Sequence, residues 1–315
     1  MSTTLSMQAN EPQPASFASP LARHVAATRP AFLTVTLAGM VLGAAASGGQ
    51  ANAALLVAGL AVLLLHAAVN VANDYFDHLS GGDAGNTQRL FPFTGGSRFI
   101  QNHVMTPRAT LLLAVSLFAA TAVLGGGLVW QGGGVIAALG GAGAALGWAY
   151  SAPPLRLNGR GWGELTVALT FWGVPLGAAQ VVAGHIAPAV VWLGGSYALL
   201  VTALLYLNQF PDRAADAAVG KRHWVVRLPL TVAPWGYVLL TLAAYGGLGW
   251  AGHRGVVSVP VLAAGGLTLP VSVWAASQLI RHAAQPAALR PAIVATISAA
   301  NVFPLAVAAT LWGGY

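Results

Sequence analysis

The chain has no cysteine and very few charged residues, which are 7% of its 315 residues. The absence of cysteine excludes disulfides, thiolate metal ligands and a cysteine nucleophile. Hydrophobic residues make up 57% of the chain and its mean hydropathy is +0.70, values that exclude a typical soluble domain. The sequence therefore predicts a protein that crosses a membrane several times.

The apolar segments have the length of membrane-spanning helices. A hydrocarbon core of roughly 30 Å needs about 20 apolar residues per helix, and these segments are long and rich in Ala, Leu and Gly rather than short and alternating, as strands would be. We therefore expect an all-α, polytopic membrane bundle of about nine transmembrane helices in a transmembrane domain of residues 30–315, after a disordered cytoplasmic tail of residues 1–29. The nine predicted spans are residues 31–48, 53–76, 107–128, 133–151, 164–183, 187–210, 229–250, 256–280 and 292–313.

Positive charges gather on one side of the predicted bundle. Thirteen of the fourteen Lys and Arg residues fall in the N-terminal tail or in loops after even-numbered spans, and Arg254 is the exception. The positive-inside rule makes this side cytoplasmic. We expect a multi-pass protein of the cell inner (plasma) membrane, with its N-terminus and its active site toward the cytoplasm. The cations form no stripe with interleaved aromatics, so the formal charge of +7 does not indicate a nucleic-acid partner.

The acidic residues are concentrated in two short polar segments. All of them except Glu11 and Glu164 lie in residues 70–83, the first island, or residues 208–222, the second island. The islands end the second and sixth predicted spans, on the cytoplasmic side. A carboxylate near a bilayer is costly unless it is paired, hydrated or bound to a cation, so these residues are candidates for function.

Each island places oxygen atoms on one helix face. Asn73 and Asp77 are four residues apart, as are Asn208, Asp212 and Asp216, and residues four apart stack on a helix. Opposed carboxylates in one cavity repel each other unless a hard cation lies between them, and Mg²⁺ takes oxygen ligands while sharing its shell with substrate phosphates. We therefore expect a central cavity, open to the cytoplasmic side, that binds Mg²⁺ and a diphosphate. Basic residues near the islands would hold the remaining charge by charge-assisted hydrogen bonds: Arg89, Arg98, Lys221 and Arg222.

Simpler interpretations of the same residues stay open. Asn-Asp pairs at helix ends are often caps or turn formers, and an isolated Asp near a membrane boundary is usually solvated. His66 is expected to be a packed polar residue inside a span, and His223 a loop residue. A membrane transporter with intramembrane acids is an alternative class, although transporters usually place such acids in broken helices at mid-membrane.

Three motifs extend the pattern over nearly the whole chain. They are Asn73-Asp-Tyr-Phe-Asp77 followed by Ser80-Gly-Gly-Asp83, then Tyr150-Ser-Ala-Pro-Pro-Leu-Arg156, then Asn208-x3-Asp212-x3-Asp216-x3-Gly220-Lys221. Together they resemble the UbiA superfamily of intramembrane prenyltransferases. The resemblance implies Mg²⁺-dependent transfer of a prenyl group from a polyprenyl diphosphate to an acceptor, usually an aromatic ring.

The resemblance also suggests roles for individual residues. The expected catalytic residues are Asp77, Asp212 and Asp216. The expected metal ligands are Asn73, Asp77, Asp83, Asn208, Asp212 and Asp216. The expected substrate-binding residues are Asn73, Arg89, Arg98, Tyr150, Arg156, Asn208, Lys221 and Arg222. Tyr150 and Trp148 are the candidates to flank an allylic cation, and Arg156, Arg160 or Arg98 is the candidate to bind an acceptor carboxylate.

One departure from the family pattern bears on the acceptor. Hydroxybenzoate-type members usually carry an Asp four residues after the position of Asp77, but this chain has Gly81 there and its next acid is Asp83. This spacing from Asp77 to Asp83, together with Gly95-Gly-Ser-Arg98, resembles the pattern of the 1,4-dihydroxy-2-naphthoate prenyltransferases of menaquinone synthesis. The segment Asn208-Gln-Phe-Pro is less typical of that group. The expected acceptor is 1,4-dihydroxy-2-naphthoate, with 4-hydroxybenzoate or another quinone or lipid acceptor as the alternative. The expected partners are thus a polyprenyl diphosphate, an aromatic quinone precursor and membrane lipid.

Overall fold

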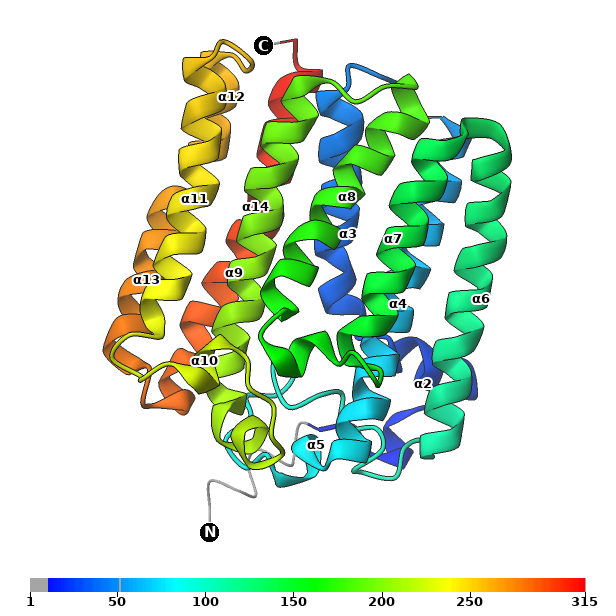
Figure 1. Cartoon of the computed structure of the whole chain (residues 1–315), viewed down its shortest axis with the longest axis vertical. Coiled ribbons are helices and arrows are strands. Elements are labelled where there is room, and N and C mark those ends of the chain that lie inside the picture. The colour runs from blue at the N-terminus through cyan, green and yellow to red at the C-terminus, as the bar shows by residue number, and fades with distance from the viewer. Residues whose placement is uncertain (1–10, 51, 315) are drawn as a thin grey trace.

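The computed structural model describes residues 11–50 and 52–314, and every regular element in them is helical (Figure 1). This confirms the predicted all-α class. The helices are α2 (Pro20–Ala27), α3 (Pro30–Ala46), α4 (Ala53–Ser80), α5 (Gly82–Gly85), α6 (Pro107–Gly132), α7 (Gly134–Ser151), α8 (Gly163–Ala183), α9 (Pro188–Ala218), α10 (Trp224–Arg227), α11 (Pro234–His253), α12 (Val259–Gly266), α13 (Leu269–His282) and α14 (Arg290–Trp312). Three short 3-10 helices join them: η1 (Pro14–Ser16), η2 (Leu157–Arg160) and η3 (Pro286–Leu289).

The expected count of nine spans is not confirmed. Seven helical segments in the described residues are long and apolar enough to cross a membrane, with α12 and α13 taken together as Val259–His282, or eight if α2 and α3, which meet at 61°, form one bent span. Helix α11 is 20 residues long but is not among them. Its sequence is rich in glycine, tyrosine and tryptophan, residues that contribute little hydropathy, whereas the prediction counted the length of the apolar segment.

Helices α4 and α9 extend beyond the spans predicted from apolarity. Helix α4 continues to Ser80 and α9 to Ala218, so both polar islands are largely helical. The 31 residues of α9 rise by about 46 Å, which exceeds the roughly 30 Å of a hydrocarbon core. Pro211 lies inside α9 without ending it. The islands are therefore held rigidly on two long helices.

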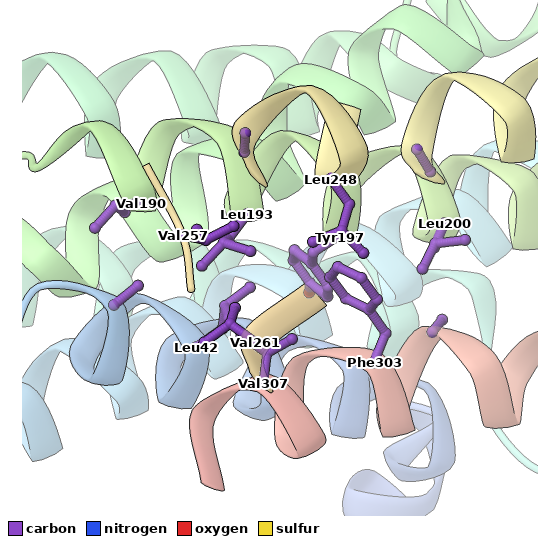
Figure 2. Packing of buried hydrophobic residues seen from close by; sticks show 14 of the residues in the cluster. Leu42, Val190, Leu193, Tyr197, Leu200, Leu248, Val257, Val261, Phe303 and Val307 are labelled. Carbon is purple, nitrogen blue, oxygen red and sulfur yellow. The ribbon is translucent and has the colours of Figure 1, made fainter. Parts of the chain in front are cut away.

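The largest buried apolar cluster ties α9 to its neighbours (Figure 2). Tyr197 of α9 is fully buried, and its hydroxyl donates a 2.6 Å hydrogen bond to the backbone carbonyl of Val35 in α3. Figure 2 shows Leu42 of α3 and Phe303 of α14 in the same cluster. Helix α3 also approaches α8 closely, because a Cβ on Gly43 would lie 2.2 Å from the carbonyl oxygen of Pro175. This packing fixes α3, α8, α9 and α14 relative to one another.

Short helices and loops cover one end of the bundle. Helices α2, α5 and α10 lie at the lower end in Figure 1, and α12 lies at the opposite end. Residues 86–106, between α5 and α6, form a connection without helix that we call the α5–α6 loop. Both islands therefore lie where these loops meet the bundle.

The N-terminal residues differ from the expected disordered tail. Residues 1–10 of that predicted tail lie outside the described residues, but η1 and α2 occupy part of the remainder. Ser19 caps α2 by accepting a 3.2 Å hydrogen bond from the Ala22 backbone N–H. The side chain of Glu11 is buried, and residue Glu11 is 5% exposed. The polar composition of this segment predicted disorder. The residues that order it, such as Arg89 and Phe99, lie far along the chain and could not be recognised from local composition.

Candidate active site

A cavity of about 930 Å³ lies between α3, α4, α6, α7, α8 and α9. Most of its walls are apolar, and α6 and α7 contribute several glycines to them. One end is polar and contains the side chains of both islands. We call this the acidic end of the cavity, and its lining includes Asn73, Asp77, Asp83, Asn208, Asp212, Asp216, Lys221 and His223.

Lys221 joins the two islands. Its Nζ lies 2.8 Å from Asp77 Oδ1 and 3.2 Å from Asp216 Oδ1. Burial lowers the pKa of Lys221, but the carboxylates of Asp77 and Asp216 outweigh that effect and raise the pKa above its ordinary value. The ammonium group is therefore charged and lies between one carboxylate of α4 and one of α9.

Asn73 is oriented by neighbours on two helices. Its Nδ2 donates to Asp77 Oδ2 at 3.2 Å and to Ser151 Oγ at 2.9 Å. Asn158 Nδ2 donates to the same Ser151 hydroxyl at 3.3 Å. The motif beginning at Tyr150 thus supports the first island, and Tyr150 itself lines the cavity.

Asp212 is held by two residues of the α5–α6 loop. Asn86 Nδ2 donates to Asp212 Oδ1 at 2.6 Å, and the Gly95 backbone N–H donates to Asp212 Oδ2 at 3.2 Å. The Ser97 backbone N–H donates to Asp74 Oδ1 at 3.1 Å. The loop therefore contacts carboxylates of both islands.

His223 is part of the site, contrary to the prediction that it is only a loop residue. It is 2% exposed, and its Nε2 lies 3.1 Å from Asp216 Oδ2. It follows Lys221 by two residues, so its proximity to the second island was the available signal. His66 also lines the cavity, deeper along α4, where its Nδ1 lies 2.7 Å from Thr36 Oγ1.

The acidic end contains oxygen atoms without hydrogen-bond partners. Asp83 Oδ2 and Asn208 Oδ1 are buried and accept no hydrogen bond. Burial raises the pKa of Asp83 well above its usual range, and the charges of Asp77 and Asp74 add to this effect. Among the described residues, no three His, Asp or Glu side chains already form a metal site. The residues fit a hard cation that completes its shell with amide and substrate oxygens.

Several predicted substrate-binding residues do not line the cavity. Arg89 and Arg98 belong to the α5–α6 loop, but their side chains pair with Glu11, at 2.7 Å and 3.7 Å respectively, outside the cavity lining. Arg156 and Arg222 are exposed and also lie outside the cavity lining. The structure therefore brings together the predicted metal ligands, Tyr150 and Lys221, but none of the four arginines.

A bundle of long apolar helices around a cavity with an acidic end defines a polytopic membrane protein with an internal cavity that is polar at one end. The model of the UbiA prenyltransferase family matches residues 32–311. The chain belongs to this family, which confirms the sequence-based assignment to these membrane prenyltransferases.

Individual relatives differ in how much of their length is matched. Chlorophyll synthase of Oryza sativa is 28% identical over 129 residues, which cover 40% of this chain and 34% of that enzyme, so the chain spans about a third of its length. The 2-carboxy-1,4-naphthoquinone phytyltransferase of Synechocystis is 26% identical over 83% of this chain and 82% of that protein. The 1,4-dihydroxy-2-naphthoate octaprenyltransferase of Mycobacterium tuberculosis is 29% identical over 66% of this chain and 70% of that protein.

Solved structures share the fold at low identity. A UbiA homolog from Aeropyrum pernix superposes with a TM-score of 0.65 and 14% identity, covering 90% of this chain and 98% of that one. A UbiA homolog from Archaeoglobus fulgidus, bound to DMAPP and Mg²⁺, gives a TM-score of 0.63 at 14% identity over 88% of this chain and 98% of that one. These likenesses establish the helical arrangement.

Proposed function

We propose that this protein transfers a prenyl group from a polyprenyl diphosphate to an aromatic acceptor. The observation that carries the proposal is the bridge made by Lys221 between Asp77 and Asp216, at 2.8 and 3.2 Å, at the one polar end of a large apolar cavity. A charged head group fits the acidic end only with cations, and a long hydrocarbon tail fits the apolar walls. A prenyl diphosphate has both parts.

The proposed cofactor is Mg²⁺. The residues that would hold it with the diphosphate are Asn73, Asp77, Asp83, Asn208, Asp212 and Asp216, and the partnerless oxygens of Asp83 and Asn208 support this assignment. When bound, the ion would neutralise charge on the diphosphate leaving group. The homolog from Archaeoglobus fulgidus solved with DMAPP and Mg²⁺ gives the same proposal independent support.

The chain's own residues would do the remaining work. The Lys221 ammonium, which pairs with Asp77 at the acidic end, would donate to diphosphate oxygens as negative charge develops on them. His223 and Asn73 keep the carboxylates of Asp216 and Asp77 oriented through hydrogen bonds of 3.1 and 3.2 Å. Tyr150 lines the cavity, where its ring could face an allylic cation. Apolar walls limit water that would otherwise quench that cation.

The proposed acceptor is 1,4-dihydroxy-2-naphthoate. The relatives in Synechocystis and Mycobacterium tuberculosis, whose names specify naphthoquinone or naphthoate substrates, match more than 60% of this chain. The spacing from Asp77 to Asp83 favours the same group. The second candidate is another ring or lipid acceptor, which the partial match to chlorophyll synthase supports.

Prenyl transfer by the purified protein tests the proposal. The protein in lipid is given Mg²⁺, a polyprenyl diphosphate and either 1,4-dihydroxy-2-naphthoate or 4-hydroxybenzoate, and products are measured by mass. We expect a prenylated, decarboxylated naphthoate product that disappears with EDTA. Product from hydroxybenzoate alone would reject the naphthoate assignment, and no product from either ring would reject both of these acceptors and leave another ring or lipid acceptor to be tested.

The proposed orientation puts the acidic end toward the cytoplasm in the plasma membrane. The absence of cysteine allows single reporter cysteines at exposed positions, Ala284→Cys after α13 and His253→Cys at the far end of α11. The Lys and Arg residues gather on the side of the bundle that has the acidic end of the cavity. We therefore expect His253→Cys to react with a membrane-impermeant maleimide in intact cells and Ala284→Cys to react only after permeabilisation. The reverse labelling pattern would invert the topology.

A further inference from the structure

The N-terminal segment, residues 11–27, lies across the α5–α6 loop. The ring of Phe17 packs against that of Phe99, with their centroids 5.3 Å apart. Arg23 Nη1 donates to the backbone carbonyl of Val104 at 3.3 Å. These contacts attach a segment near the N-terminus to the loop that holds Asp212.

Glu11 makes the charged contacts of this segment. Its Oε1 lies 2.7 Å from Arg89 Nε, and its Oε2 lies 3.7 Å from Arg98 Nε. Asn102 Nδ2 donates to the same Oε2 at 3.2 Å. In the part of the chain that the structure describes, neither arginine forms an ion pair with any other carboxylate.

The two arginines also contact the backbone of residues at the acidic end. Arg89 donates to the backbone carbonyl of Asn86, and the Asn86 side chain donates to Asp212 at 2.6 Å. Arg98 donates to the backbone carbonyl of Asp83, whose side chain lines the cavity. Two chains of contacts therefore run from one carboxylate to two residues of the site.

Removing the negative charge of Glu11 would take away the carboxylate that pairs with both Arg89 and Arg98, and would leave Asp83 and Asp74 as the acidic groups that still favour the Arg98 cation. Burial lowers the pKa of Arg98, and the neighbouring charge of Arg89 lowers it further, so the surroundings already disfavour this cation. Removing one partner of a buried ion pair is strongly destabilising. Repulsion between the two guanidinium groups would then separate the residues that the loop positions.

We infer that Glu11 is a positioning residue of the acidic end: it holds Arg89 and Arg98, and through them Asp83 and the Asn86–Asp212 pair, in the arrangement that binds the metal and diphosphate. The inference deepens the proposed function and rests on it for the identity of the ligand. Glu11 itself touches neither the cavity nor the reacting atoms.

Glu11→Gln tests this role because glutamine keeps the size of the side chain and removes its charge. We expect the KM for the prenyl diphosphate to rise about 10-fold, the usual scale for loss of a supporting contact behind a metal site, while the KM for the acceptor stays at its wild-type value. Ser19→Ala is the matched control, since it removes the cap of α2 in the same segment but does not touch either arginine.

Hydrogen exchange of the loop gives a measurement that needs neither metal nor substrate. In the metal-free protein, the Gly95 and Ser97 amides are protected by Asp212 and Asp74. We expect Glu11→Gln to speed exchange of these amides about 10-fold relative to wild type and Ser19→Ala, because the loop opens more often. Should Glu11→Gln fail to fold, Glu11→Asp keeps the charge, shortens its reach and gives the same test with a smaller shift.

The outcomes separate this inference from the proposed function. Unchanged exchange and an unchanged donor KM in a folded Glu11→Gln protein would overturn the positioning role, whatever the activity. A rise in both KM values together would also overturn it, because that result indicates general disorder. Faster loop exchange in a protein whose wild type transfers no prenyl group would support the loop contacts and reject the proposed function alone.

Discussion

Asp77→Asn is expected to reduce prenyl transfer by about 10³-fold while the protein stays folded and inserted in the membrane. The carboxylate of Asp77 pairs with Lys221 at 2.8 Å and accepts a hydrogen bond from Asn73 at 3.2 Å. An asparagine amide in its place has no charge. Its NH₂ group would also face a donor, either the Lys221 ammonium or the Asn73 side-chain amide, so one of the two hydrogen bonds would be lost. The acidic end would then bind the metal and diphosphate weakly.

Initial rates at saturating Mg²⁺ measure this effect, with the melting temperature in detergent as the check on folding. Asp77→Glu, which keeps the charge, is the comparison and is expected to retain more activity than Asp77→Asn. Asp212→Asn is expected to lose as much as Asp77→Asn, because Asp212 accepts from Asn86 and from the Gly95 amide. A wild-type rate in folded Asp77→Asn would remove the assignment of metal and diphosphate to this end of the cavity.

The core of the site could be predicted because it follows from helical periodicity. Asn73 and Asp77 share one face of α4, and Asn208, Asp212 and Asp216 share one face of α9, as four-residue spacing requires. Apolar length placed these helices in a membrane bundle, where isolated carboxylates must find partners. Lys221 was expected near them because it lies in the same island. Local spacing therefore predicted the residues that meet in the cavity.

The surroundings of the site could not be predicted, because they depend on contacts between distant parts of the chain. Glu11 and Arg89 are 78 positions apart, and no periodicity relates them. Arg89 and Arg98 were expected to bind substrate because they are cations close to an island in sequence. The loop turns their side chains toward Glu11 and presents backbone N–H groups to the islands instead.

Gly96 illustrates how backbone conformation decides this arrangement. It adopts a φ of +72°, and a Cβ there would lie 2.4 Å from Asp83 Oδ2. Only glycine fits such a close approach in the left-handed region. The Gly95-Gly-Ser motif was noted for its resemblance to one subfamily, but its physical role is to let the loop pack against the carboxylates.

Lys221→Met is expected to lower the rate of prenyl transfer about 100-fold, because the departing diphosphate loses a fixed cation. Methionine keeps an unbranched side chain, so the apolar stem of the lysine is largely preserved. The metal-free variant would also leave Asp77 and Asp216 opposed without the ammonium that now lies between them. We therefore expect a lower melting temperature than wild type in EDTA.

Added Mg²⁺ separates the two effects of Lys221→Met. A cation that binds between Asp77 and Asp216 replaces part of the lost ammonium charge, so Mg²⁺ should raise the melting temperature of the variant more than that of wild type. Arg222→Gln is the matched control: Arg222 is adjacent in sequence but exposed and outside the cavity, so both its rate and its Mg²⁺ response should stay near wild type. Equal Mg²⁺ shifts in wild type and Lys221→Met would contradict a metal position between the two islands. A rate loss confined to Arg222→Gln would instead indicate that the exposed Arg222 binds the diphosphate. Lys221 would then serve only to neutralise the carboxylates of Asp77 and Asp216.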